Sequence, residues 1–285
     1  MAVARPSKMR DPVAAPVTVR DGERRWGVAM RARLFLLRRM VARDVSVRFA
    51  GTTIGLAWGI FQPLVMLGLY TFVFQYVYRV GAVEGGHSFA AFAFCGLWPW
   101  MSFQEGVLRA TTAVLDNAGI VKKLQFPSEL FVGSVVLSSA ITHGVGLALF
   151  VVSFLAVTDP ARLLALPLLA VPVALQLALT IGLGLLLACA QVFVRDVLQI
   201  ATPALTVWFF LTPIVYAEGL VPAAMRPLLE WNPMTPVIRL YRAVILGTDI
   251  GSVWGPCYSA AVAILLLGAG RVAFRRCRPF FADHL

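Results

Sequence analysis

The sequence predicts an all-α integral membrane protein with six transmembrane helices, an N-terminal amphipathic interface helix and a re-entrant helical hairpin between spans five and six. The first observation is composition: 59% of the 285 residues are hydrophobic and 14% are charged, whereas about a quarter of an ordinary soluble domain is charged. The second is a series of apolar runs long enough to cross a bilayer. The third is charge placement, because twelve of the 25 Lys and Arg residues lie in residues 1–50, as is typical of basic segments beside membrane spans.

The first 49 residues are predicted to stay outside the bilayer core. Residues 1–27 contain charges and prolines but no apolar core, so they are predicted to form a flexible cytoplasmic tail and not a signal peptide. Residues 28–285 are predicted to form a single transmembrane domain. At its start, residues 28–49 place apolar and basic side chains on different faces, which predicts a cationic helix in the membrane interface. A solvated basic helix is the alternative.

Six apolar runs supply the spans. In residues 52–78 the only side chains more polar than Thr or Tyr are Gln62 and Gln75, and at 1.5 Å per residue this run reaches about 40 Å. The six spans are predicted at residues 52–78, 88–115, 130–157, 163–194, 199–216 and 252–274. Six crossings place both termini on one side. With the termini in the cytoplasm, inner segments hold 19 Lys and Arg and outer segments five, which agrees with the positive-inside rule.

The stretch between spans five and six differs from the spans. Its two short apolar pieces, 221–230 and 234–246, meet at Trp231-Asn232-Pro233, and neither is long enough to cross. Backbone that turns back at membrane depth needs protein or a watery cavity around it. A re-entrant pair is therefore predicted, with a surface helical hairpin as the alternative.

Catalytic and metal-binding motifs are not found in the sequence. No Ser or Thr follows any of the three lysines, so there is no Walker A motif and the chain cannot power itself with a P-loop. The three histidines stand apart and the four cysteines lack zinc or disulfide spacing, which predicts no metal site. Nucleic-acid binding is disfavoured because the basic stretches lie beside spans and carry no nucleic-acid motif.

Two features of the spans leave alternatives open. Glu105 and Arg109 lie four residues apart on one helix, acid first, which favours a self-neutralising pair; lining or gating a conduit is the alternative. Aromatic residues are dense in 70–78, 89–103 and 208–210. They are expected to form an interface belt or to pack, or else to make a stacking track for sugar rings.

The loop 116–129 is the candidate docking element for a soluble partner. It is short and basic, ends in Phe126-Pro127, and is expected to present a small helix. A plain connector is the alternative.

Several short motifs, in a fixed order, resemble a known family. They are Arg43-Asp44 with Arg48-Phe49, Gly55, Trp58 and Gln62-Pro63; Leu97-Trp98-Pro99-Trp100; Val121-Lys122-Lys123 with Phe126-Pro127; and Asn232-Pro233 with Tyr241-Arg242 and Leu246-Gly247. From about residue 33 onward, the chain resembles the membrane permeases of type 2 ABC exporters, which move polysaccharides and polyol phosphates such as O-antigen, capsule or teichoic acid. One departure is Phe49, where the family often has Tyr.

The resemblance implies a homodimer that works with two copies of a soluble nucleotide-binding ABC ATPase in the cytoplasmic (inner) membrane. ATP and magnesium would bind to the ATPase, the substrate would be a lipid-linked glycan, and membrane lipids would surround the spans. ATPase docking is assigned to Arg38, Arg39, Arg43, Asp44, Asn117, Val121, Lys122, Lys123 and Phe126. The outer gate is assigned to Trp231, Asn232, Pro233, Tyr241 and Arg242. The conduit or lateral opening is assigned to Tyr70, Phe74, Trp98, Trp100, Glu105, Arg109, Trp208 and Phe209.

Two other functions compete with polysaccharide export. An integral-membrane enzyme acting on lipid-linked sugars would need a cluster of carboxylates or histidines at an interface, which the sequence lacks. A related permease could export drugs or small lipids instead.

Overall fold

The structure is a computed structural model that describes residues 19–49, 58–77, 79, 86–123 and 126–285. All regular elements in these ranges are helices, and no strand occurs among them, which confirms the all-α class. The chain divides into two compact units, residues 1–36 and 37–285. The described residues do not include most of the predicted tail. They also leave out the start of the predicted first span, with Gly55.

Helix α1 (Val19–Phe49) begins in the first unit and ends in the second. It starts earlier than the predicted residue 28, because Arg and Glu in residues 19–27 favour a helix without adding apolar periodicity. In the first unit, Met30, Leu34 and Phe35 are exposed, as an interface helix requires. Its position in a membrane interface stays a prediction.

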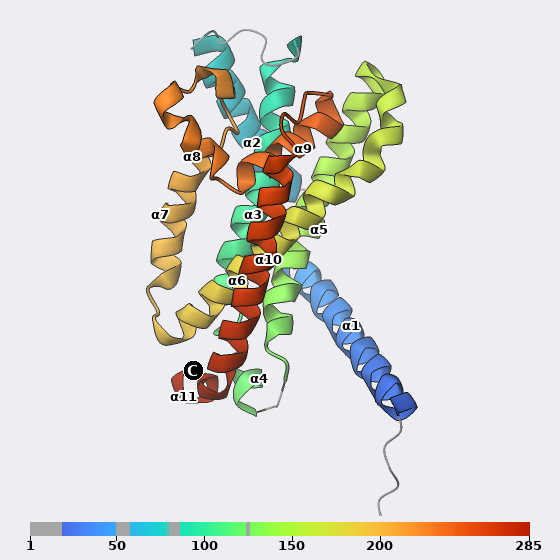
Figure 1. The fold of residues 1–285 in the computed structure, drawn as a ribbon, viewed down its shortest axis with the longest axis vertical. Coiled ribbons are helices and arrows are strands. Elements are labelled where there is room, and N and C mark those ends of the chain that lie inside the picture. The colour runs from blue at the N-terminus through green and yellow to red at the C-terminus, as the bar shows by residue number, and fades with distance from the viewer. Residues whose placement is uncertain (1–18, 50–57, 78, 80–85, 124–125) are drawn as a thin grey trace, which may run out of the picture. The chain divides into compact units, whose positions relative to one another are not determined.

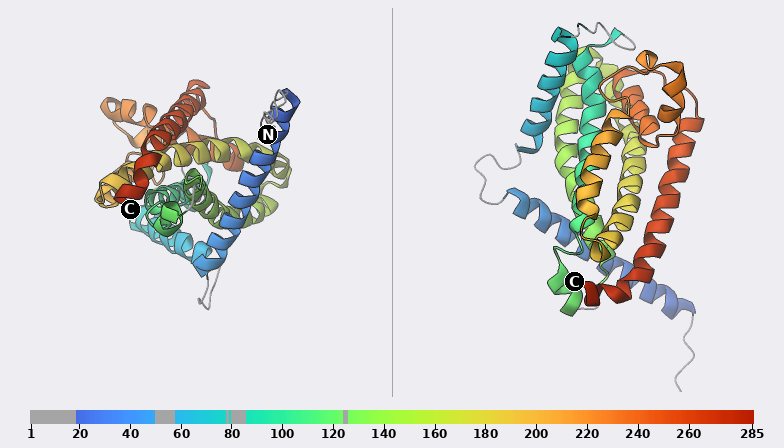
Figure 2. Two further views of the ribbon diagram at one scale, coloured as in Figure 1. Left: turned by 90° about the horizontal axis from the view of Figure 1, so that it is seen from below. Right: turned by 90° about the vertical axis from the view of Figure 1, so that its left-hand side faces the viewer.

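Helix α3 (Phe89–Thr112) is the central helix of the second unit. Ser88 caps it by accepting a 3.3 Å hydrogen bond from the backbone N–H of Ala91, and residues 91–100 are buried on every face, as expected for a helix that is apolar all round. It packs against α2 (Trp58–Thr71), α5 (Glu129–Thr158), α6 (Ala170–Phe193), α7 (Val197–Phe210) and α9 (Met234–Leu246). Figures 1 and 2 show α3 among these helices.

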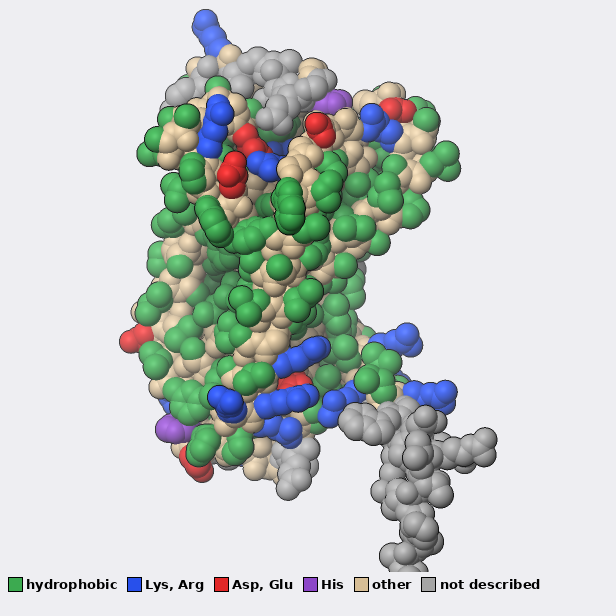
Figure 3. All heavy atoms as spheres, in the orientation of Figure 1, with side chains coloured by type: hydrophobic (Ala, Val, Ile, Leu, Met, Phe, Trp, Pro, Cys, Tyr) green, Lys and Arg blue, Asp and Glu red, His purple; other side chains and the backbone are tan. Residues whose placement is uncertain are grey.

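Three helical stretches of the described chain are long and apolar enough to cross a membrane. They are α5, the run 160–193 formed by the 3-10 helix η4 (Pro160–Leu169) with α6, and the run 254–280 that begins with α10 (Trp254–Cys277). They correspond to the predicted spans three, four and six. Figure 3 shows a broad surface of hydrophobic side chains over the middle of the second unit. Ile264 and Leu265 of α10 are among the large hydrophobic residues that are exposed. Lipid is the environment in which such a surface is stable.

The described part of the predicted first span, residues 58–77, is helical throughout, as α2 followed by a π-helix, η2 (Phe72–Val77). The predicted fifth span is shorter as a helix than expected. It is helical only to Phe210, and bends follow to residue 216. Pro213 explains this end, because the residue before a proline is disfavoured in the α conformation.

The region predicted to form a re-entrant pair contains one regular helix and one irregular part, and its re-entrant course in a membrane stays a prediction. Helix α9 has the predicted bounds, 234–246, and Gly247 ends it in the left-handed conformation with φ 73°, as is common at helix C-termini. The first half holds only short 3-10 turns (Glu218–Leu220 and Ala223–Met225) and α8 (Arg226–Glu230). Both halves lie at the end of the second unit opposite α4 (Ala118–Lys123) and α11 (Phe281–His284) (Figure 1).

Helix α6 crosses α10 and α3 at glycines. A Cβ added at Gly182 would lie 2.7 Å from the backbone of Leu266 and Leu267, and one at Gly270 would lie 2.7 Å from the carbonyl oxygen of Gly182. On the α3 side, a Cβ at Gly184 would lie 2.7 Å from that of Ala110. Small residues let helix backbones approach closely inside membranes, so these glycines set the two crossings.

Candidate functional site

Four charged side chains meet where the end of α1 passes α3. Arg109 Nη2 donates to both carboxylate oxygens of Asp44, at 2.6 and 2.7 Å. Arg48 binds Glu105 through two contacts, of which Nη2 to Oε2 is 2.7 Å. Each helix carries its acid and base four residues apart, in the same order, so two antiparallel helices can form both pairs at once. The Arg48–Glu105 pair is bidentate, with two nitrogens on two oxygens, and such arginine–carboxylate pairs are the strong ones. We call these four residues the charged crossing.

Helix α5 extends the charged crossing with two polar side chains. Ser139 Oγ donates to Glu105 Oε1 at 2.9 Å, and His143 Nε2 lies 2.9 Å from Glu105 Oε2. Glu105 and Arg109, the pair expected from the sequence, are 3.8 Å apart, which is longer than either pair between helices. The sequence analysis missed the partners on α1 and α5, although the repeated acid and base spacing at 44 and 48 was a usable signal.

The charged crossing is partly shielded from water. Its side chains are between 23% and 30% exposed, so water screens the pairs only partly. No group of three or more His, Cys, Asp or Glu in the described part of the chain could hold a metal ion. The arrangement therefore ties three helices together and offers no metal chemistry among those residues.

The residues predicted to dock an ATPase fall on two elements. On α1, Arg38, Arg39 and Arg43 are exposed, whereas Asp44 belongs to the charged crossing. The second element is the loop 116–129, which contains the expected small helix, α4. Asn117 closes the preceding turn through a 2.9 Å hydrogen bond from Nδ2 to the carbonyl oxygen of Ala113. The docking residues of α4 and its loop differ in exposure, with Lys122 and Lys123 exposed and Val121 and Phe126 packed against a buried cluster.

Asn232, predicted in the outer gate, joins α7 to α9. Its Oδ1 accepts from Trp208 Nε1 at 2.8 Å and from the backbone N–H of Met234 at 3.0 Å. Its Nδ2 donates to Thr212 Oγ1 at 2.8 Å and to the carbonyl oxygen of Leu211 at 3.2 Å. One buried amide side chain thus hydrogen-bonds to polar groups at the end of α7 and at the start of α9.

Replacing Asn232 with alanine is expected to destabilise the protein by about 2 kcal/mol, because buried donors lose their acceptor. Thermal unfolding of the purified protein in detergent measures this loss. Trp231, the neighbouring residue, is 72% exposed, so Trp231→Ala serves as the control and should change stability by about 0.5 kcal/mol or less. Equal losses in the two variants would contradict the role given to Asn232.

Tyr241 links the same region to α6 and to Pro99 within α3. Its hydroxyl donates to Gln176 Oε1 at 2.9 Å, and Gln176 Nε2 donates to the carbonyl oxygen of Pro99 at 3.0 Å. A cavity of about 80 Å³ lies beside this chain of hydrogen bonds, and Trp98 and His143 contribute to its wall. The hydrogen bonds show how a polar tyrosine is accommodated in the core.

Arg242 is buried against α3 although it carries a full charge. Its guanidinium carbon lies 3.4 Å from the ring centroid of Phe92, and its Nη2 donates to the carbonyl oxygen of Ile214 at 2.8 Å. A desolvated cation–π contact of this kind is stabilising. Pro233, another predicted gate residue, is tied to α10, because Ser259 Oγ donates to its carbonyl oxygen at 2.6 Å.

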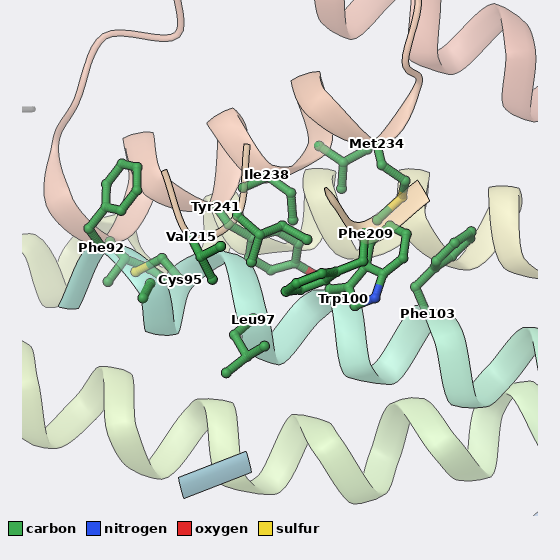
Figure 4. Close-up of a cluster of buried hydrophobic side chains, with 14 of the residues drawn as sticks. Phe92, Cys95, Leu97, Trp100, Phe103, Phe209, Val215, Met234, Ile238 and Tyr241 are labelled. Carbon is green, nitrogen blue, oxygen red and sulfur yellow. The ribbon is translucent and has the colours of Figure 1, made fainter. Parts of the chain in front are cut away.

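Four of the residues predicted in the conduit or lateral opening form one aromatic cluster. Tyr70 of α2 lies 5.9 Å from Phe209 of α7, and Trp100 of α3 lies 5.8 Å from Phe209 and 6.1 Å from Trp208. Phe74 joins the cluster at its edge, 6.5 Å from Tyr70. Figure 4 shows Trp100 and Phe209 packed together with residues of α9. The cluster connects α2, α3 and α7.

Trp98 lies apart from that cluster. Its Nε1 donates to the carbonyl oxygen of His143 at 2.7 Å, and its ring covers Gly146 on α5. It therefore packs α3 against α5, while Trp100, two residues later, faces α7. Glu105 and Arg109, the two remaining conduit candidates, lie in the charged crossing.

An apolar cavity of about 260 Å³ lies between α3, α6 and α7. Val107, Leu187, Leu205 and Trp208 are among the residues that line it. It borders the aromatic cluster through Trp208. These walls are almost entirely apolar and offer few hydrogen-bond partners.

Comparison with known proteins identifies the family. The sequence profile of the ABC-2 type transporter family matches residues 36–246. The chain is 29% identical to the O-antigen export system permease protein RfbA of Myxococcus xanthus, over 88% of this chain and 95% of that protein. It is 26% identical to the protein of the same name from Klebsiella pneumoniae, over 85% and 92%, and 21% identical to the polysialic acid transport protein KpsM of Escherichia coli, over 82% and 90%. The apolar helices and the family match together show that this chain is a membrane-embedded permease of the ABC-2 type transporter family.

Proposed function

We propose that this chain is the permease subunit of an ATP-driven transporter that exports a lipid-linked cell-surface polysaccharide, of the O-antigen or capsule type, across the cytoplasmic membrane. The observation that carries this proposal is similarity over more than four-fifths of the chain to permeases named for O-antigen export and polysialic acid transport. The names describe those relatives, and the extent of the match supports the same class of cargo here.

The proposed topology has six crossings and both termini in the cytoplasm. Lys and Arg side chains gather at the end of the second unit that carries α4 and α11 (Figure 3). At the opposite end, basic residues are balanced by acids, as in the pairs of Arg162 with Asp159 and Arg239 with Glu218. The positive-inside rule therefore favours a cytoplasmic α4 end. The region 221–246 would then form the outer gate.

The proposed energy source is a separate ABC ATPase, two copies of which would serve a permease homodimer and bind ATP with magnesium. Exposed basic residues on α1 and α4 would form the docking surface. When the ATPase closes, the charged crossing would carry the displacement of α1 to α3 and α5 as a rigid-body movement. The aromatic cluster of α2, α3 and α7 would border the lateral opening for the glycan lipid.

Reversing both charges on α4, in a Lys122→Glu and Lys123→Glu double variant, tests the docking assignment. Both side chains are exposed, so membrane insertion should be unchanged, whereas export and permease-stimulated ATP hydrolysis should be lost by electrostatic repulsion at the docking surface. Arg226→Glu is the control, because Arg226 is exposed at the opposite end and its reversal should leave ATPase stimulation intact. Normal export by the double variant would count against the assignment.

A further inference from the structure

The C-terminal segment returns along the docking loop. After α10 ends at Cys277, the chain turns through a 3-10 helix, η7 (Arg278–Phe280), into α11. Helix α11 contacts both α4 and α6, and Figure 1 shows it beside α4. Residues 278–285 therefore lie against the element that carries Lys122 and Lys123.

Phe281 anchors this segment to the ends of α6 and α10. Its side chain is fully buried. Its ring centroid lies 5.1 Å from that of Phe274, nearly perpendicular, and 6.2 Å from that of Phe193. The ring of His284, one turn later, lies 4.9 Å from that of Phe193. Edge-to-face aromatic contacts of this kind favour one geometry over others.

The docking loop is attached to the same buried cluster from its own side. Arg278 Nη2 donates to the carbonyl oxygen of Phe126 at 2.9 Å, and the ring of Phe126 lies 5.0 Å from that of Phe131 at the start of α5. The cluster that contains Phe281 is also contacted by apolar residues of every docking element. These residues are Met40 of α1, Ile120 and Val121 of α4, Phe126 and Leu285.

Helix α4 is too short to be stable by itself. It has six residues, and helices of this length form in proteins only through tertiary packing. The packing available to α4 includes α11, so the orientation of its lysines depends on the C-terminal segment.

We propose that residues 278–285 position the ATPase docking surface by holding α4 in the orientation that presents Lys122 and Lys123 to the partner. The inference rests on the proposed function and deepens it. It names residues that position α4 and that contact neither nucleotide nor glycan. Phe281 and Arg278 are positioning residues in this scheme. Load applied to α4 then passes into α6 and α10 through Phe281.

The test compares two neighbouring phenylalanines in the full-length chain. Phe281 is fully buried, whereas Phe280 is 57% exposed. Hydrogen–deuterium exchange of the purified permease should show the backbone of 117–123 exchanging about tenfold faster in Phe281→Ala, because local opening of α4 becomes easier. Phe280→Ala should leave that exchange unchanged, and Phe281→Leu should restore most of the protection.

The second readout is ATP hydrolysis by the complex with an ABC nucleotide-binding subunit. Phe281→Ala should lower the stimulation of ATP hydrolysis by the permease about tenfold, within the range typical of coupling between sites, while Phe280→Ala keeps it. Unchanged exchange and stimulation in Phe281→Ala would overturn the inference. So would a rise in exchange spread over α5 and α6, because the segment would then only stabilise the fold.

Failure of the proposed function gives a different result. If the wild-type chain did not stimulate the nucleotide-binding subunit at all, the proposed function would fall and the inference with it. If the wild type stimulated hydrolysis and Phe281→Ala did so equally, the proposed function would stand and only the inference would fail.

Discussion

A Glu105→Gln variant is expected to lose most export activity and about 3 kcal/mol of stability, the lower end of the range for breaking a buried ion pair. Glu105 receives hydrogen bonds from Arg48 and Ser139 and lies within hydrogen-bond distance of His143. Its neutralisation leaves the Arg48 guanidinium without its charged partner in a site that is only 24% exposed. Because α1 would keep only one of its two ion pairs to α3, the pair of Asp44 with Arg109, movement at the docking surface would reach the spans much less effectively.

Exchanging the two charges tests whether Arg48 and Glu105 act through the ion pair between them or each independently. Arg48→Glu and Glu105→Arg should each be as damaging as Glu105→Gln, and the double variant should recover part of the stability and export that the single variants lose. Glu129→Gln is the matched control, since Glu129 lies 3.9 Å from Arg275, whose side chain is 72% exposed, and exposed pairs contribute about 0–1 kcal/mol. Additive losses in the double variant would contradict the charged crossing.

A Gly270→Val variant is expected to separate α10 from α6 and to cost about 3 kcal/mol or more, the upper part of the range for overpacking. An added Cβ would lie 2.7 Å from the carbonyl oxygen of Gly182 and 3.0 Å from the Cβ of Leu185. A backbone carbonyl cannot move aside as the end of a flexible side chain can, so the helices themselves must part. The yield of inserted protein and the midpoint of its thermal unfolding measure the loss.

Gly268 provides the control on the same helix. A Cβ at this position would meet nothing within 4 Å, so Gly268→Val should remain within about 0.5 kcal/mol of the wild type. A similar loss of inserted protein in both variants would show that helix propensity, and not the crossing, causes the effect. An intact Gly270→Val variant would contradict the close packing of α6 and α10.

Local sequence patterns were sufficient to predict most of the helices. Helix α9 has its predicted bounds because Pro233 and Gly247 mark its ends. Helix α7 stops earlier than predicted because hydropathy continues past Phe210 although the backbone bends before Pro213. The start of α1 was missed because charged residues extend a helix without an apolar stripe. The periodicity of apolar residues indicates which face of a helix is buried. It therefore does not predict the ends of a helix that continues without burying one face.

The partners within the candidate site could not be predicted from local patterns. The sequence places Asp44 and Arg48, and again Glu105 and Arg109, four residues apart, but which acid meets which base depends on how α1 and α3 pack. The same holds for Asn232, whose Asn-Pro dipeptide indicates a break in the chain and not the four hydrogen bonds that join α7 to α9. Long-range contacts of this kind are a property of the fold.

Transport by the purified components tests the central claim most directly. The chain would be reconstituted in liposomes with a lipid-linked glycan, with or without a nucleotide-binding ABC subunit, and the glycan reaching the opposite leaflet would be measured. The account predicts transfer only when both the ABC subunit and hydrolysable ATP are present. Transfer or chemical turnover of the glycan lipid by this chain alone would contradict it.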